Sequence, residues 1–211
     1  MSRLVIHPTP TAQWHALINE AQSAAQCQLE EDLESYLVFL LIRFTTRPEM
    51  HSRIMANDFL EECQSPNNHQ HERWRDIGDH CLLFSGLFPQ QAQRRLVSLG
   101  YFVALGQNAY SQIADSEYHP DIGSHSELYA DLANEFVLLM DILHSMRTLH
   151  HHNDPLLQPL QAYELWMQTG SQHALQSIHP DNSSSSLILQ PDAAPTSPAS
   201  TSPNKNNKPF H

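Results

Sequence analysis

The stretch GDHCLLFSGLFP, residues 78–89, is typical of a helix that packs closely against a neighbour and then ends. At about 100° per residue, Trp74, Cys81 and Phe84 fall on one apolar face. Gly78 lies near that face, and a small residue there lets another backbone approach closely. This packing role offsets the cost of about 1 kcal/mol that glycine brings to a helix interior. The stretch therefore predicts a close helix crossing.

Asp79 and His80 stand side by side in this stretch and raise the question of a reactive pair. Both project off the face of Trp74 and Phe84, and His80 shares its side with Asp76 at the i,i+4 spacing of a surface pair. The chain shows no serine elbow, P-loop or GxGxxG pattern that would supply chemistry. We therefore predict a surface pair and no catalytic residue. The alternative that Asp79 or His80 faces a pocket stays open, and both are kept as lesser candidates for buried polar groups.

Helical patterns account for most of the chain up to residue 179. Hydroxyl caps, acidic first turns and prolines in first turns mark the helix starts, and no alternating Val/Ile/Thr-rich segment suggests a strand. The sequence predicts an all-α single bundle of about six or seven helices over residues 1–179. The expected helices run from Thr9 or Thr11 to Gln26, Leu29 to Phe44, Thr46 to Cys63, His71 to Phe84, Gln91 to Ala114, Ser124 to His150 and Asp154 to Ile178.

Residues 180–211 differ in composition from the rest of the chain. They are rich in Ser, Pro and Asn, and such a segment cannot bury enough apolar surface to offset the entropy lost on ordering. We expect a disordered C-terminal tail in which Leu187–Leu189 is the only adhesive point. One alternative function follows: a translocated protein whose tail is an address read by a secretion system.

The charge and the cysteines exclude several classes of protein. The net charge is −12 with only 11 basic residues, so we expect no nucleic-acid partner. The 15 histidines make pH sensitivity conceivable, since an unperturbed imidazole titrates near pH 6.5. The three cysteines form no CxxC pair, which argues against a disulfide framework and for a reducing compartment. We predict a cytoplasmic protein.

The sequence also argues against a membrane protein. The N-terminal apolar run Leu4–Ile6 is too short for a signal peptide. The longest apolar run, Tyr36–Ile42, is far below the roughly 20 residues of a membrane-spanning helix. We therefore expect no membrane span.

Glu135 is the strongest candidate for a buried polar group. On a continuous helix it projects among apolar residues, and a buried carboxylate there needs a cation, a metal or a proton. We expect a salt bridge to Arg43 or Arg95. Glu34, one turn before the apolar run of its helix, is a weaker candidate of the same kind. The apolar neighbours of Glu135 in this projection are Leu128, Leu132, Leu139 and Met146.

A comparison with helical di-iron carboxylate bundles tests whether the chain holds a metal site. Those bundles need Glu residues from two helices and a Glu-x-x-His pair from each of the other two. The only acidic-x-x-His match is Asp141 with His144, which projects away from Glu135. We therefore predict no metal site and no cofactor. The leading hypothesis is a non-enzymatic protein-binding or regulatory module, with homo-oligomers possible; the alternative is a metal-dependent redox enzyme with a carboxylate/His site.

Overall fold

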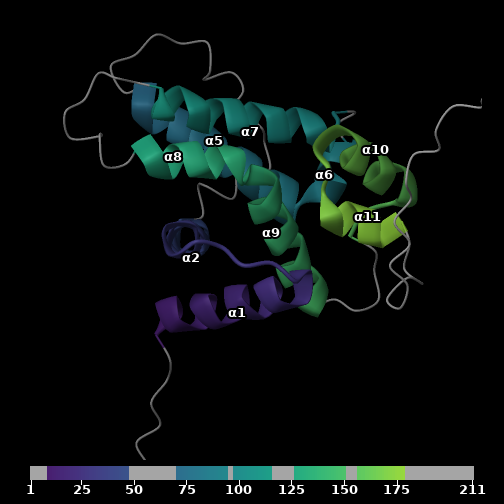
Figure 1. The fold of residues 1–211 in the computed structure, drawn as a ribbon, viewed down its shortest axis with the longest axis horizontal. Helices are drawn as coiled ribbons and strands as arrows, with labels where there is room; N and C mark the ends of the chain where they lie inside the picture. The colour runs from purple at the N-terminus through teal and green to yellow at the C-terminus, as the bar shows by residue number, and fades with distance from the viewer. Residues whose placement is uncertain (1–8, 48–69, 95–96, 116–125, 151–155, 179–211) are drawn as a thin grey trace, which may run out of the picture. The chain divides into compact units, whose positions relative to one another are not determined.

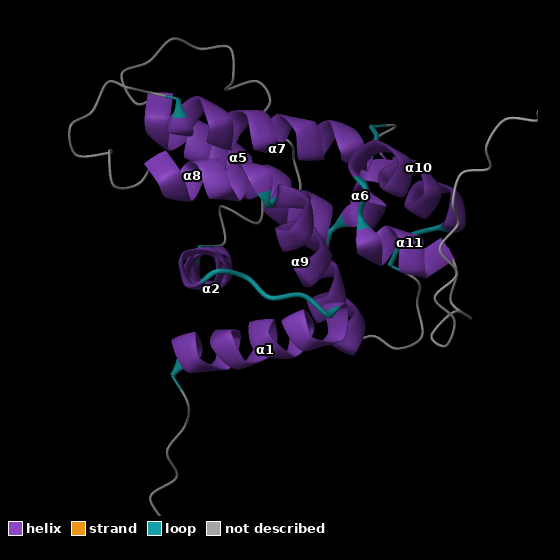
Figure 2. Ribbon diagram, viewed as in Figure 1, coloured by secondary structure: helices purple, strands orange, loops and turns teal. Residues whose placement is uncertain are grey.

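The structure, a computed structural model, describes residues 9–47, 70–94, 97–115, 126–150 and 156–178. These ranges hold nine α-helices and no strand. Figure 2 draws the helices in purple and the connecting loops in teal. The all-α prediction is therefore confirmed for the described residues. The helices, labelled in Figure 1, are α1 (Pro10–Ala25), α2 (Glu31–Thr46), α5 (Gln70–Leu87), α6 (Pro89–Arg94), α7 (Leu99–Ala114), α8 (Ser126–Asn134), α9 (Phe136–His150), α10 (Pro159–Thr169) and α11 (Gln172–Ile178).

The helix count exceeds the predicted six or seven because three expected helices are each divided in two. The expected helix Gln91–Ala114 is α6 and α7, with Ser98 capping the second. A turn at Glu135 separates α8 from α9. Gly170, at φ 74°, ends α10 before α11 begins. The expected helix Thr46–Cys63 lies mostly outside the described residues, as does the predicted tail.

The helix starts were predicted with mixed success. Thr9 caps α1 as expected, since its hydroxyl accepts a hydrogen bond from the amide of Ala12 at 3.2 Å, and Pro10 takes the first position. Thr46 does not open a helix: it is the last residue of α2, and its hydroxyl donates to the Ile42 carbonyl at 2.8 Å. The last expected helix starts later than predicted, because Pro159 takes the first position of α10.

Helix α5 lies at the centre of the packing. It packs most extensively against α7 and also contacts α6 and α9, while α7 packs in turn against α8 and α10. Helix α1 lies against α2 and α9, as Figure 1 shows. The core is correspondingly large and aliphatic or aromatic, and its biggest fully buried side chains are Tyr110, Phe84, Phe102 and Phe136. None of the described helices combines the length and the apolar character needed to cross a membrane.

Gly78 lies at a close contact between α5 and α7, although its close neighbour is a side chain and not the backbone that the sequence predicted. A Cβ atom on Gly78 would overlap the Tyr110 ring of α7, so glycine lets this ring lie against the α5 backbone. Gly106 does the same on α7, where a Cβ atom would overlap the Phe136 ring and come within 2.9 Å of the Cys81 Cβ. Glycine at these positions therefore brings α5, α7 and α9 into close contact.

Candidate functional site

Asp79 is the centre of a buried polar cluster that joins three helices. Its carboxylate on α5 is fully buried. The hydroxyls of Tyr36 on α2 and Tyr110 on α7 both donate to Oδ1, at 2.6 and 2.8 Å. The guanidinium of Arg43 on α2 donates to Oδ2. A buried carboxylate costs several kcal/mol unless it is paired and hydrogen-bonded, and here three donors meet that need.

The electrostatics of the cluster keep the hydroxyl groups of Tyr36 and Tyr110 protonated. Burial raises the pKa of Asp79 above the usual range, while the guanidinium of Arg43 acts in the opposite direction. Burial and the neighbouring carboxylate raise the pKa of Tyr36 and Tyr110 well above that of a free phenol. Both hydroxyls therefore remain donors at neutral pH. The ring centroids of Tyr36, Tyr110 and Tyr129 lie 6.1 to 6.3 Å apart, so the three rings pack against one another beside Asp79.

The predicted surface pair of Asp79 and His80 is wrong, because both residues are buried. The prediction assumed that α5 buries one face and exposes the other. Residues 77–86 of α5 are in fact buried without interruption, since α7 and α9 both pack against this helix. Asp79 is nonetheless no reactive dyad with His80: its hydrogen bonds go to Tyr36, Tyr110 and Arg43.

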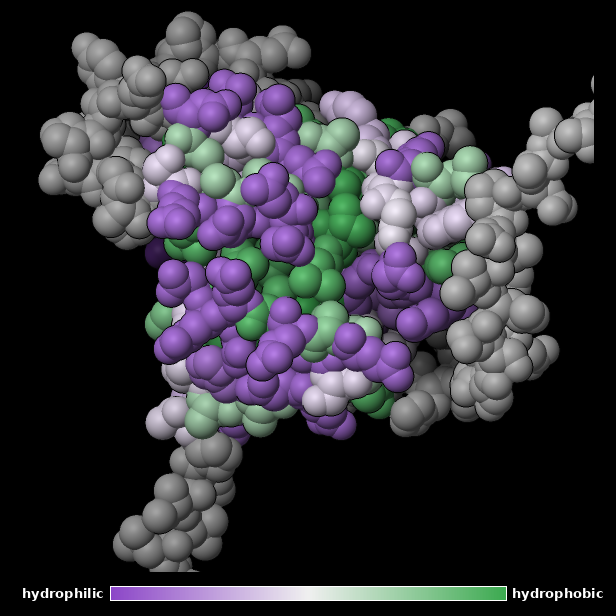
Figure 3. All heavy atoms as spheres, in the orientation of Figure 1, coloured by the Kyte–Doolittle hydropathy of each residue, from purple (hydrophilic) through white to green (hydrophobic). Residues whose placement is uncertain are grey.

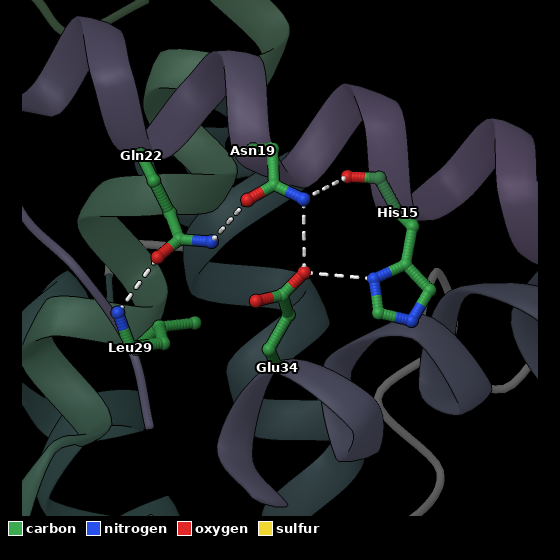
Figure 4. A network of polar contacts seen from close by, with 5 residues as sticks. All are labelled: His15, Asn19, Gln22, Leu29 and Glu34. Atoms are coloured by element: carbon green, nitrogen blue, oxygen red, sulfur yellow. Dashed lines mark hydrogen bonds and ion pairs between the residues drawn. The ribbon is translucent and has the colours of Figure 1, made fainter. Parts of the chain in front are cut away.

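Glu34 is half-buried and belongs to a polar network between α1 and α2, shown in Figure 4. Its Oε1 atom lies 2.7 Å from Nδ1 of His15 and accepts from the Asn19 amide at 3.1 Å. Asn19 also accepts from Gln22, whose own oxygen accepts from the Leu29 amide nitrogen at 2.7 Å. The network therefore fixes the turn between α1 and α2.

Glu135 is exposed, which corrects the prediction that it points inward. The buried stripe of α8 and α9 includes Leu132, Phe136 and Leu143. Glu135 adjoins Phe136 in sequence and so projects about 100° from the middle of that stripe. Of its two expected partners, Arg43 pairs with Asp79, and Arg95 lies outside the described residues.

Asp141 and His144, the one acidic-x-x-His pair, lie together on α9 but serve separate contacts. Asp141 accepts from the Ser171 hydroxyl at 2.5 Å and from the amides of Gln172 and His173 at 2.8 and 3.3 Å. Its carboxylate thus holds the start of α11. Among the described residues, no group of three or more His, Cys, Asp or Glu side chains comes together that could hold a metal ion.

His144 contacts a second histidine across the interface between α9 and α11. The ring centroids of His144 and His173 are 5.0 Å apart. His144 is fully buried, and its Nε2 atom lies 2.9 Å from the carbonyl oxygen of Ser85 on α5. Burial lowers the pKa of His144 to about 3 and that of His173 to about 4. Both imidazoles are therefore neutral near pH 7.

Helix α10 exposes an apolar stripe, defined by Leu160, Tyr163 and Met167. These side chains are 69%, 49% and 60% exposed, and they supply three of the five large exposed apolar residues in the described part of the chain. The opposite side of the helix, with Ala162 and Leu165, is buried in the core. Helix α10 is therefore apolar on both sides, although only one side packs against the described core.

A second apolar surface lies over α9. Figure 3 shows a strip of apolar residues at the place that α9 holds in Figure 1, bordered by polar residues. Val137 and Leu138 of α9 are half-buried and pack against the core. These half-buried side chains of α9 already serve the fold and so differ from the exposed side chains of the α10 stripe.

Sequence reasoning missed the partners of Asp79, His173 and the α10 stripe. Tyr36, Arg43 and Tyr110 are 43, 36 and 31 residues away from Asp79, so no local pattern connects them. The i, i+3, i+7 spacing of the α10 stripe is visible in the sequence. Which side of α10 is buried depends on its tertiary contacts.

No protein-family model, curated protein or solved structure matches the chain.

Proposed function

We propose that this protein is a non-enzymatic binding or regulatory module that docks a protein partner on the α10 stripe. One observation supports the proposal above all: Leu160, Tyr163 and Met167 are exposed on a helix whose other side is already buried. Covering one such aliphatic side chain completely contributes about 1.5 to 3 kcal/mol. A partner gains that free energy, whereas the isolated domain does not.

The chemistry of α10 defines the kind of partner. Glu164 is the only charged residue of the helix, so charge steering contributes little to docking here. Residues at i, i+3 and i+7 form a ridge that suits the groove of another helix. The partner we propose is a protein with an apolar helical face. We propose the reducing cytoplasm as the compartment, because the three cysteines are widely spaced and form no pattern of a disulfide framework.

Site-specific photo-crosslinking tests this proposal. A photoreactive phenylalanine analogue replaces Tyr163 in the full chain, expressed in its native cells. We expect one discrete adduct, which the double variant Leu160→Gln/Met167→Gln abolishes because it removes the flanking apolar contacts. Glutamine keeps the helix propensity close to that of Leu and Met. The same probe at exposed Gln13 of α1 is the matched control and gives no such adduct.

Two results would contradict the proposal. One is an adduct at position 163 that persists unchanged in the double variant, since docking would not then depend on the stripe. The other is a stoichiometric transition metal in dialysed protein by elemental analysis, which would support the metal-dependent redox enzyme instead.

A further inference from the structure

The contact between His144 and His173 leaves two buried ring nitrogens without hydrogen-bond partners among the residues that the structure describes. A carbonyl oxygen only accepts hydrogen bonds, so the Nε2 atom of His144, 2.9 Å from the Ser85 oxygen, carries the proton. The Nδ1 atom of neutral His144 is then a bare lone pair. This Nδ1 atom and that of His173 are both buried, and neither has a hydrogen-bond partner within the described ranges. The contact between the rings is therefore held by packing of neutral rings alone.

In the described part of the chain, the ionisable groups around this contact offer no counter-ion for an imidazolium. Arg147 of α9 is itself a cation, and its guanidinium is bound to the Leu87 carbonyl and the Gln90 side chain. Asp141 turns both carboxylate oxygens to the start of α11. Cys27 follows α1. Burial and the negative charge of Asp141 raise the pKa of its thiol, so Cys27 is neutral near pH 7. A proton added to either ring therefore brings an unpaired charge into the interface.

We propose that the His144–His173 contact is an acid-sensitive latch that holds the α10–α11 hairpin on α9 only while both imidazoles are neutral. Helix α11 reaches α9 through His173 and through the capping contacts of Asp141, and α10 packs directly against α11. Release of α11 therefore removes a main support of α10, which presents the α10 stripe, while α7 still contacts α10. The biological meaning of the latch rests on the proposed function, but its existence does not.

The direction of the pH effect follows from the two states. A solvated histidine binds a proton near pH 6.5, whereas the latched rings have pKa values lowered to about 3 and about 4. As the pH falls below 6.5, the released state gains protons that the latched state does not bind, so latching weakens. At pH 5, each histidine that becomes solvated favours release by about 30-fold.

Residue-resolved hydrogen exchange of the full chain tests the latch. Protection factors, which correct for the intrinsic pH dependence of exchange, are compared at pH 7.5 and pH 5.0. We expect the amides of α10 and α11 to lose protection by about 30-fold or more, while those of α5 and α7 stay protected. His173→Asn removes one titrating ring. The loss of protection in α10 and α11 between pH 7.5 and pH 5.0 should therefore be smaller than in wild type, by up to about 30-fold. His15→Gln, on α1, is the matched control and keeps the wild-type response.

Three results would overturn the latch. The first is equal protection of α10 and α11 at both pH values. The second is a parallel loss in α5 and α7, which would show global acid unfolding. The third is a His173→Asn variant with the full wild-type response. Because the experiment uses the free protein, it can fail while the crosslink at position 163 succeeds, and the reverse also holds.

Discussion

Asp79 shows how one buried carboxylate can define the arrangement of three helices. Tyr36, Arg43 and Tyr110 donate to it from α2 and α7, so a shift of either helix leaves donors or acceptors unpaired. Such clusters are weak evidence for high stability, since a packed apolar core can do as well. Removing one member is costly, because the remaining charge stays buried. The role we assign to Asp79 is therefore structural specificity.

Asp79→Asn tests this role at the scale of one residue. The substitution leaves the Arg43 guanidinium, only 24% exposed, without its anion. We expect a loss of roughly 3 kcal/mol in the free energy of unfolding, measured by urea denaturation at pH 7. Tyr36→Phe removes one of three donors and should cost about 1 kcal/mol. If Asp79→Asn cost no more than Tyr36→Phe, the carboxylate would not be central to the cluster.

At the scale of elements, the sequence predicts the helices better than their ends. Thr9 and Pro10 mark the start of α1 because capping is a local interaction. Gly170 was a readable stop signal, since glycine favours the left-handed backbone that ends α10. The turn at Glu135 had no such signal: backbone hydrogen bonds continue through it, from Glu135 to Asp131 at 2.8 Å. The division between α8 and α9 therefore has no local signal in the sequence that would predict it.

Gly78→Ala tests the crossing of α5 and α7. Alanine has a helix propensity about 1 kcal/mol more favourable than that of glycine. Its methyl group must, however, displace the buried Tyr110 ring, and the cost of this overpacking exceeds the gain in propensity. We expect a net loss of about 1 to 2 kcal/mol by urea denaturation. Gly100→Ala is the matched control, because there the methyl group meets the end of the flexible, exposed Gln168 side chain. Equal effects of the two substitutions would argue against a special crossing at Gly78.

At the scale of the whole molecule, the candidate site was less predictable than the fold. Helical periodicity predicts an all-α chain because each helix pattern is local. The burial of Asp79 and the exposure of Glu135 depend instead on which neighbours cover α5 and α9, and those neighbours are distant in sequence. The α10 stripe can be identified as a second apolar side of the helix only when Ala162 and Leu165 are known to be buried on the opposite side. The proposed function therefore rests on tertiary contacts and not on a local sequence pattern.

The free energy of unfolding of Leu160→Gln/Met167→Gln tests most directly whether the α10 stripe contributes to the stability of the fold. The account predicts a value within about 0.5 kcal/mol of wild type, as for ordinary surface substitutions. Leu165→Ala, on the buried side of the same helix, should lose about 2 to 5 kcal/mol and shows that the assay senses α10. A loss of more than about 2 kcal/mol in the double variant would contradict the account, because the stripe would then be covered by the chain itself.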